Sequence, residues 1–453
     1  MVVFDFTSEQ LSLHMGNSFQ ARYLRKYLEK PYLMAKTCVL EEDYIDKDYL
    51  IDYSKFYARS FNAPKRATKR IHFFSGTFND EDLTSALTCN EGAKNFEVQK
   101  GNYLGFCTIK DVKDFGDEYL IGRTILSHYP EPDGDSTRVF IHKGNDDTDT
   151  YKISLYGIKL TINTLPFQVQ DEGVSKCATI ALWIAMQPLQ TTFGIPAYSP
   201  AEITEICSTT PSEERNFPSQ GLNLGQMITY IKCLGLEPET LKATPEIVEA
   251  AVKAYIPENL PILVDLTLVK NGENDYHAAV ISGYRHNKKK EIEEIYLHDD
   301  GIGPYSKAKY EIITVNKKWK ILNGMDVVSL KNEWVTERGY DALIITRLIV
   351  PVYPKMRLTF SRIYKEFLRS KNSIEARGLT AILQPKKVND YKKYLLSNNI
   401  ENKETILKTP MPRFLWIMRA LDEDNPIFDE VYDATSVYAK KVVGLETINY
   451  KRK

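Results

Sequence analysis

The clearest hydrophobic pattern in the chain starts at Cys177. Residues 177–186 are apolar almost all the way round a helix, which predicts a buried helix that begins at Cys177. Ser175 stands just before this run, where a hydroxyl group can cap a helix N-terminus. Pro188 stands just after the run and is expected to lie past the end of the helix.

Further helices and then strands are predicted in the same part of the chain. Capping residues followed by apolar residues at helical spacing predict helices that begin near Ser199, Asn223 and Thr244. From residue 261 the pattern changes to strand-like runs, and Asn271-Gly272 between the first two is a turn signal. The expected strands cover residues 261–269, 277–283, 294–298, 310–315 and 342–350. Helices first and strands second indicate an α+β domain, because strand and helix do not alternate.

The length of 453 residues suggests two or three domains. We divide the chain into three segments. Residues 1–160 mix helical and strand patterns in a region of unknown role. Residues 161–350 carry the helices and strands described above, and residues 351–453 form a C-terminal α+β region.

Composition and charge exclude several classes of protein. The formal net charge of −1 gives no electrostatic footprint for nucleic acid or an anionic membrane. No apolar run approaches the roughly 18 residues of a membrane-spanning helix, and the first residues lack a signal-peptide pattern. Six scattered cysteines without a CxxC pair argue against a disulfide framework and a zinc site, and they suit a reducing cytoplasm. Phosphate-binding glycine motifs are missing, and His72 and His142 have no partner at metal spacing, so we expect no cofactor and no metal.

Cys177 is the candidate nucleophile. A helix N-terminus carries unsatisfied N–H groups and the positive end of the helix dipole, and both favour a thiolate. A helix N-terminus and a neighbouring imidazolium can lower a thiol pKa from about 8.5 to roughly 3.5–7.5. A thiolate of this kind is a nucleophile at neutral pH. The alternative for a lone cysteine at this place is an inert, buried core residue.

His277 and a nearby aspartate are candidates for the partners of this thiol. His277 opens a predicted strand after a turn, where its imidazole can face a helix. Asp299 and Asp300 follow the next strand, and either carboxylate can accept a hydrogen bond from the imidazole and fix its orientation. His298 is expected to face outward. Taken singly, the histidine can be structural and the Asp-Asp-Gly run a plain turn.

A side-chain amide upstream of the thiol can complete such a site. Attack on a carbonyl group develops an oxyanion, which N–H donors stabilise. Gln168 and Gln170 both precede Cys177 in the loop that leads to it. Either glutamine can also be an ordinary solvent-facing loop residue.

This order of Gln, Cys on a helix, His on a strand and Asp after a strand resembles the papain-like cysteine peptidases. It is most similar to the branch that processes bacteriocin leader peptides, and residues 221–235, a helix with a glycine stop, match that branch as well. The resemblance covers about residues 161–350. It implies a papain-like fold, in which a helical layer packs on an antiparallel sheet, and a protein or peptide substrate. The roles it implies are nucleophile for Cys177, general base and acid for His277, orienting carboxylate for Asp299 and oxyanion donor for Gln170.

The sequence departs from the pattern of that branch in three places. Six residues separate Gln170 from Cys177 where the branch has five, so the loop must bulge or Gln168 takes the role. Ala and Thr follow Cys177 where the branch has Gly and a small residue, and Asp300 competes with Asp299. The chain shows no ATP-binding or transmembrane region such as the bacteriocin processors carry, so leader export is not implied.

We therefore expect a cytoplasmic cysteine peptidase that hydrolyses peptide or isopeptide bonds through a thioester acyl-enzyme on Cys177. The same residues also suit a transglutaminase-like or other amide-modifying acyl transferase. A third interpretation is a catalytically silent binding or regulatory module of the same fold. In each case the regions that flank residues 161–350 can bind a regulatory protein partner.

Overall fold

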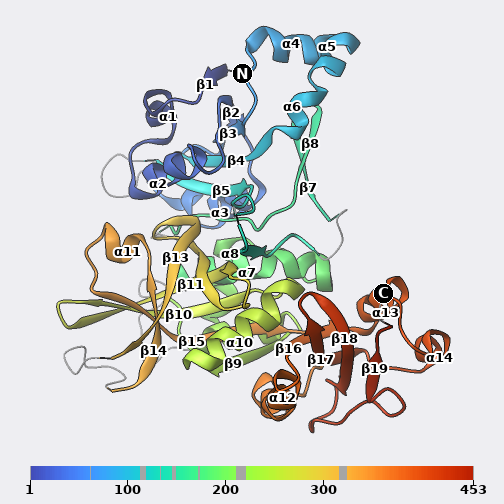
Figure 1. Cartoon of the computed structure of the whole chain (residues 1–453). Helices are drawn as coiled ribbons and strands as arrows, with labels where there is room; N and C mark the ends of the chain where they lie inside the picture. The colour runs from blue at the N-terminus through green and yellow to red at the C-terminus, as the bar shows by residue number, and fades with distance from the viewer. Residues whose placement is uncertain are drawn as a thin grey trace.

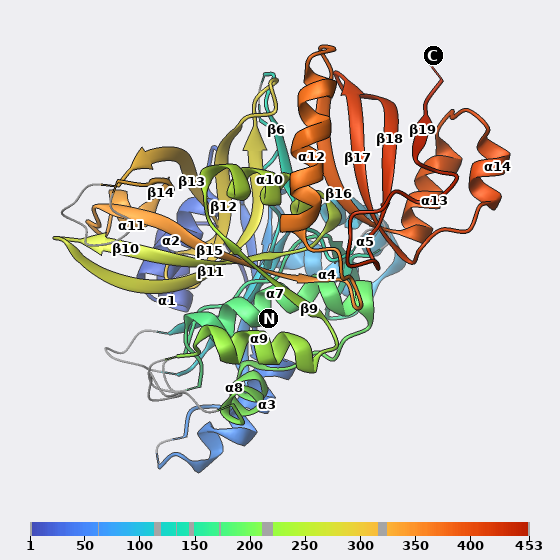
Figure 2. The same cartoon turned by 90° about the horizontal axis from the view of Figure 1, so that it is seen from below.

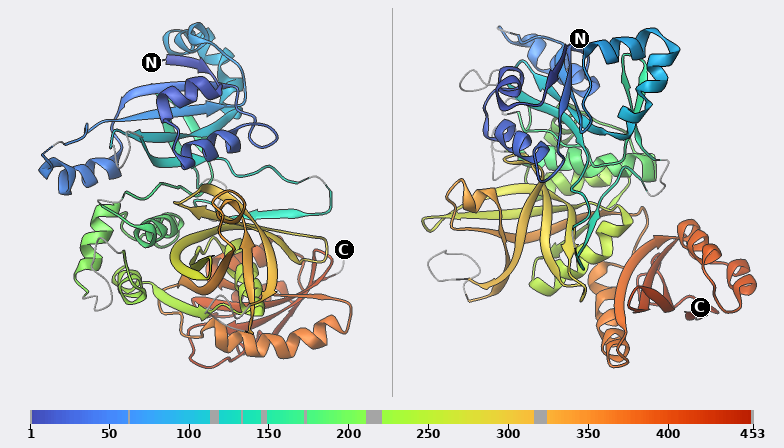
Figure 3. Two further views of the ribbon diagram at one scale, coloured as in Figure 1. Left: turned by 90° about the vertical axis from the view of Figure 1, so that its left-hand side faces the viewer. Right: turned by 45° about the horizontal axis from the view of Figure 1, so that its top comes forward.

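The computed structural model describes residues 2–61, 63–112, 119–132, 134–144, 149–171, 174–210, 221–315 and 324–451. It is a mixed α/β structure whose named strand pairs are all antiparallel. Three larger sheets follow one another along the chain, and the N-terminal and C-terminal sheets lie on different sides of the central one (Figure 1, Figure 3). None of the described helices is long and apolar enough to cross a membrane.

The N-terminal part is built on a five-stranded sheet with the strands in chain order. Its strands are β1 (Val2–Asp5), β2 (Thr37–Tyr44), β3 (Thr68–Phe74), β4 (Tyr103–Lys110) and β5 (Leu120–Leu126). The helices are α1 (Ser8–Met15), α2 (Phe19–Leu28), α3 (Lys47–Lys55), the short η1 (Tyr57–Arg59), α4 (Asp80–Thr88), α5 (Asn90–Asn95) and α6 (Glu97–Gly101). A separate hairpin of β7 (Tyr151–Leu155) and β8 (Ile158–Ile162) buries its apolar face against this sheet.

The central part contains a closed barrel of six strands. These strands are β10 (Ile262–Lys270), β11 (Glu273–His286), β12 (Ile292–Asp299), β13 (Gly303–Thr314), β14 (Asp326–Lys331) and β15 (Ala342–Val352). The barrel closes because β10 pairs with both β11 and β15. β9 (Glu237–Lys242) extends the sheet at β15, and β6 (Thr137–Phe140), which precedes residue 160, pairs with β11.

The central part also contains helices, which pack on the barrel, on one another and on the neighbouring parts of the chain. They are α7 (Cys177–Phe193), α8 (Pro200–Ser208), α9 (Leu224–Cys233), α10 (Pro245–Tyr255), the short η2 (Ile256–Glu258) and α11 (Glu333–Thr336). The predicted starts at Ser199, Asn223 and Thr244 are confirmed, because each side chain accepts a hydrogen bond from the backbone N–H three residues later. α7 packs against β10, β11 and β12, and most of its residues are buried.

Two expectations for the ends of α7 are wrong. Ser175 does not cap it: Lys176 is the cap residue, and the Ser175 hydroxyl accepts a hydrogen bond from the Asp171 N–H instead. Pro188 lies inside the helix, which runs on to Phe193 and ends at Gly194 with a φ of 66°. A proline in a helix costs about 3 kcal/mol, but here buried residues on both sides of it, Leu189 among them, stabilise the continued helix.

The C-terminal part is a four-stranded sheet with helices on it. The strands are β16 (Thr380–Lys387), β17 (Phe414–Asp422), β18 (Asn425–Asp433) and β19 (Thr447–Asn449), and the helices are α12 (Phe360–Glu375), α13 (Val388–Ser397) and α14 (Lys403–Lys408). α12 lies along β16 and β17 (Figure 2). One hydrophobic cluster includes Leu24 of α2, Trp183 of α7 and Trp416 of β17, so the three parts share a continuous core.

Candidate active site

Cys177 is the first residue of α7, and its side chain is half-buried at a cleft. The cap residue Lys176 makes no side-chain hydrogen bond to the first turn of the helix. The backbone N–H groups of this turn are therefore not capped by the side chain that precedes them. Together with the helix dipole, they make this end of α7 electropositive.

His277 faces this thiol from the barrel. It lies inside β11, opposite Leu266 of β10, so the expectation that it opens a strand is wrong. β11 is longer than predicted because polar residues of the hairpin arm, from Glu273 on, continue the backbone pairing with β10. Cys177 and His277 line the same cleft, and the thiol is one of the neighbouring groups that raise the pKa of the His277 ring, so the predicted nucleophile and the predicted base lie close together.

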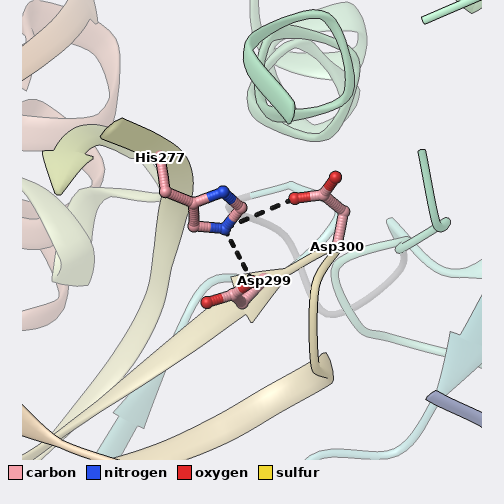
Figure 4. Close-up of side chains that lie close together, drawn as sticks. All are labelled: His277, Asp299 and Asp300. Carbon is pink, nitrogen blue, oxygen red and sulfur yellow. Dashed lines mark hydrogen bonds and ion pairs between the residues drawn. The ribbon is translucent and has the colours of Figure 1, made fainter. Parts of the chain in front are cut away.

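Asp299, the last residue of β12, supports the other side of the ring. Nε2 of His277 lies 2.8 Å from Oδ1 of Asp299, and Figure 4 shows that this nitrogen is also the one that faces Asp300. Asp299 is fully buried, and its carboxylate also accepts hydrogen bonds from the Gly301 N–H at 2.9 Å and the Trp334 indole N–H at 2.7 Å. The structure therefore brings Cys177, His277 and Asp299 into one chain of contacts.

The charges of this cluster reinforce one another. Burial alone would lower the pKa of His277, but the charge and hydrogen bond of Asp299 and the contact with Cys177 raise this pKa well above its usual value. Burial would raise the pKa of Asp299, but the charge of His277 and the donors around the carboxylate outweigh it, so this pKa is lowered. An ionised Asp299 beside a protonated imidazole is the arrangement that these directions favour.

The two candidate glutamines differ in burial. Phe167 exchanges two backbone hydrogen bonds with Thr124, at 2.7 and 2.8 Å, so the loop that leads to Cys177 adds to the edge of the N-terminal sheet at β5. Gln168 is 2% exposed, and its Nε2 has no hydrogen-bond partner among the described residues. Gln170 is half-buried. Neither glutamine lines the open cleft, and Gln168 is the one with a buried, unused N–H donor.

His298 is buried, so the expectation that it faces outward is wrong. Its Nδ1 accepts a hydrogen bond from the Tyr305 N–H at 3.2 Å, and its Nε2 lies 3.0 Å from the carbonyl oxygen of Leu165. With Nδ1 as acceptor, Nε2 carries the proton and donates to that carbonyl. Burial lowers the pKa of His298 to about 3, so the ring stays neutral and anchors the start of the glutamine loop to β12. The sequence contains no signal for this contact, because Leu165 and His298 are far apart along the chain.

The N-terminal part also holds α7 in place. The Trp183 indole N–H donates to Oδ2 of Asp48 in α3, at 2.9 Å. Arg123 of β5 pairs with the same carboxylate at 2.5 Å and with Asp46 at 3.2 Å. Trp183 stands six residues after Cys177 on α7, so this buried cluster fixes the helix that presents the thiol.

A cleft of about 850 Å³ opens beside Cys177 and His277. Its walls combine apolar side chains such as Met227 of α9 with an ion pair between Arg347 and Asp265, whose charged atoms are 3.0 Å apart. The cleft is open to solvent and large enough for several residues of an extended peptide.

The cluster of His277, Asp299 and Asp300 also has the composition of a metal site. One ligand atom from each residue lies within 4.8 Å of the others. However, the Asp299 oxygens already accept from His277, Gly301 and Trp334, and a cation would have to displace these donors. The donor set therefore fits a hydrogen-bonded imidazole better than a bound metal ion.

Comparison with known proteins adds no family: no protein-family model matches the chain, and no curated protein is a significant match. The chemistry of the site must therefore be argued from its own geometry. A thiol, an imidazole that can hold its proton, and a buried carboxylate behind the ring are the groups required for acyl transfer through a cysteine.

Proposed function

We propose that this protein is a cysteine peptidase that hydrolyses peptide or isopeptide bonds. The observation that carries the proposal is the contact chain from Cys177 to His277 to Asp299 at the wall of an open cleft. A structural histidine would not need a thiol on one side and a buried carboxylate on the other. The resemblance of this residue order to the papain-like peptidases agrees with the proposal.

In the proposed reaction, His277 takes the proton of the Cys177 thiol. The thiolate sulfur attacks the carbonyl carbon of the substrate and forms a C–S bond, and the electron pair of the C=O group moves to its oxygen. The N–H groups at the start of α7, with Gln168 or Gln170, stabilise this oxyanion. His277 then gives its proton to the leaving amine as the C–N bond breaks, which leaves a thioester on Cys177.

Hydrolysis of the thioester completes the proposed cycle. His277 takes a proton from a water molecule, whose oxygen attacks the thioester carbon. The C–S bond breaks, the carboxylic acid leaves, and the sulfur recovers the proton from His277. Asp299 accepts the ring N–H throughout and keeps the imidazole in one orientation.

The cleft suggests the class of substrate, and the free thiols suggest the cellular compartment. A cleft of about 850 Å³ with apolar walls and an ion pair suits a peptide chain with mixed side chains. All six cysteines are free thiols, which agrees with a reducing compartment such as the cytoplasm. The flanking regions are candidates for binding a regulatory protein.

Selective labelling of Cys177 tests the reactive thiol. Brief treatment of the full chain with iodoacetamide, followed by peptide mass spectrometry, should modify Cys177 faster than the exposed Cys233. Cys89 is a stringent control, because a hydrogen bond with Ser85 and one from the Gly92 N–H lower its pKa. Labelling of Cys177 no faster than that of Cys233 would favour a catalytically silent module.

Turnover of a peptide library tests the reaction itself. Cys177→Ala should abolish cleavage and leave thermal unfolding unchanged, because the side chain is small and half-buried. Cleavage that persists in this variant would overturn the proposal. The same assay with an added primary amine separates hydrolysis from transamidation: incorporation of the amine would show a transglutaminase-like enzyme.

A further inference from the structure

Asp300 lies against the same histidine nitrogen as Asp299. Its Oδ1 is 3.5 Å from Nε2 of His277, and the residue is only 2% exposed (Figure 4). Its Oδ2 is buried and has no hydrogen-bond partner among the described residues. Burial of a second carboxylate with an unpaired oxygen costs free energy. Its position beside the His277 ring therefore indicates a role there.

The N-terminal part of the chain holds the turn that carries Asp300. Gln20 of α2 donates from Nε2 to the backbone carbonyl of Asp300 at 3.2 Å. Tyr23, one turn later on α2, donates to the carbonyl of Pro304 at 3.0 Å. The Tyr23 ring covers Gly303 so closely that an added Cβ would lie 2.2 Å from it. α2 therefore contacts the turn on both sides of its tip.

We propose that Asp300 is a positioning residue for His277: a second carboxylate whose negative charge keeps the proton on the ring, held in place by Gln20 of α2. This inference rests on the proposed function, because it assigns a role toward the same Cys177–His277 pair. It also gives the N-terminal part of the chain a direct role in the site.

The groups around Asp300 determine the sign of the effect. Cys177 approaches His277 from α7, Asp299 lies on β12, and the Arg338 guanidinium donates to the Gly301 carbonyl at 2.7 Å. α2 presents the uncharged Gln20 to the turn. Burial, with the neighbouring charge of Asp299, raises the pKa of Asp300 to about 7 although His277 lowers it.

Asp300 therefore gains its charge as the pH rises through neutrality. Below about pH 7 it is protonated, and only Asp299 stabilises the imidazolium. Above that pH a second negative charge faces the ring, so His277 keeps its proton to a higher pH than Asp299 alone would allow. The protonated imidazole beside Cys177 then persists further into the alkaline range.

The test is the pH dependence of Cys177 alkylation by iodoacetate in the full chain, from pH 5 to 10. The positive imidazolium attracts this anionic reagent, so the alkylation rate falls when the His277 ring loses its proton. The wild-type profile should show an inflection near pH 7 and a decline on the alkaline side. Asp300→Asn keeps the shape of the side chain and should remove the inflection and move the alkaline decline down by about one pH unit. An identical profile in Asp300→Asn, with thermal unfolding unchanged, overturns the inference.

Gln20→Ala gives a second and independent variant, because it leaves the two carboxylates intact. It should shift the alkaline decline in the same direction by a smaller amount. The matched control is Lys26→Ala, which removes an exposed ion pair between α2 and Glu337 and should leave the profile unchanged. If Gln20→Ala behaves like this control, α2 does not position Asp300.

The same experiment keeps this inference separate from the proposed function. If Cys177 is not alkylated faster than Cys233 in the wild type, the proposed peptidase fails. If Cys177 is alkylated faster than Cys233 but its pH profile does not depend on Asp300, the proposed peptidase is unaffected. Only the role of Asp300 as a second carboxylate is then excluded.

Discussion

Nε2 of His277 lies 2.8 Å from Oδ1 of Asp299, and the Trp334 indole N–H donates to the other oxygen of that carboxylate at 2.7 Å. One oxygen of the carboxylate is thus fixed by Trp334, while the other oxygen accepts the hydrogen bond from the His277 ring. Such support fixes the tautomer of the imidazole as well as its orientation, because Nε2 must carry a proton to donate to Asp299.

Loss of the Asp299 charge should therefore impair catalysis strongly. Asp299→Asn should lower kcat by roughly 10²- to 10⁴-fold, the range that general acid–base catalysis contributes. Trp334→Phe removes one donor and keeps the charge, so it should lower kcat by about tenfold. Steady-state kinetics on a peptide substrate measure both. Equal, small effects of the two substitutions would show that Asp299 does not orient the base.

The buried amide of Gln168 makes it the better candidate for the oxyanion donor. Gln168→Ala should lower kcat by about 10²- to 10³-fold, because one donor to the oxyanion is lost. Gln170→Ala is the matched control and should change kcat by less than about threefold. The reverse ranking would return the role to Gln170, the residue that the resemblance implies.

The sequence predicts the middle of the chain well where the signals are local. The capping residues Ser199, Asn223 and Thr244 each start a helix, because the hydrogen bond that forms the cap involves only neighbouring residues. The order of Cys177, His277 and Asp299 also follows from local patterns. Their approach to one another depends on how α7 packs on the barrel, which no local pattern encodes.

Long-range contacts explain what the sequence could not predict. Pro188 is a helix breaker by local rules, yet burial on all sides keeps it inside α7. His298 has the local pattern of a surface residue beside a turn, yet it bonds to Leu165 in the core. Trp334 and Gln20 reach the site from distant segments, and no motif marks either of them.

The arrangement of donors around Asp299 predicts that activity does not depend on a divalent cation. Dialysis of the full chain against EDTA should leave the rate of peptide cleavage unchanged within about twofold, because the Asp299 oxygens are occupied by hydrogen bonds. The control is the same protein after readdition of Mg²⁺ or Zn²⁺. A loss on chelation that the metal reverses would assign His277, Asp299 and Asp300 to a metal centre.

The contact between Trp183 and Asp48 should contribute to the stability of the whole chain. Trp183→Phe removes a donor to a buried carboxylate and should lower the free energy of unfolding by about 1–3 kcal/mol. Lys55→Ala is the matched control, because it breaks an exposed ion pair between α3 and α8 and should cost less than about 1 kcal/mol. Thermal unfolding followed by circular dichroism distinguishes the two. Equal losses would mean that the buried cluster does not join α3 to α7.

Glu239 makes stability depend on pH at the junction between β9 and α12. Its carboxylate accepts from the Tyr255 hydroxyl and from the Phe360 N–H, and burial raises its pKa from 4.5 to about 7. The folded state therefore binds a proton that the unfolded state has already released, so stability falls as the pH rises from about 4.5 to about 7 and then levels off.

Glu239→Gln removes this titration and should flatten the decline in stability between pH 5 and 8. Titration of Glu239 should lower the free energy of unfolding of the wild type by up to about 3 kcal/mol over this interval, since one pKa unit corresponds to about 1.4 kcal/mol. Urea unfolding at several pH values measures the slope. The absolute stability of the variant can differ, because a glutamine amide presents a donor where the carboxylate has only acceptors, but this cost does not change with pH. An unchanged slope would show that Glu239 is already ionised in the folded protein at pH 5.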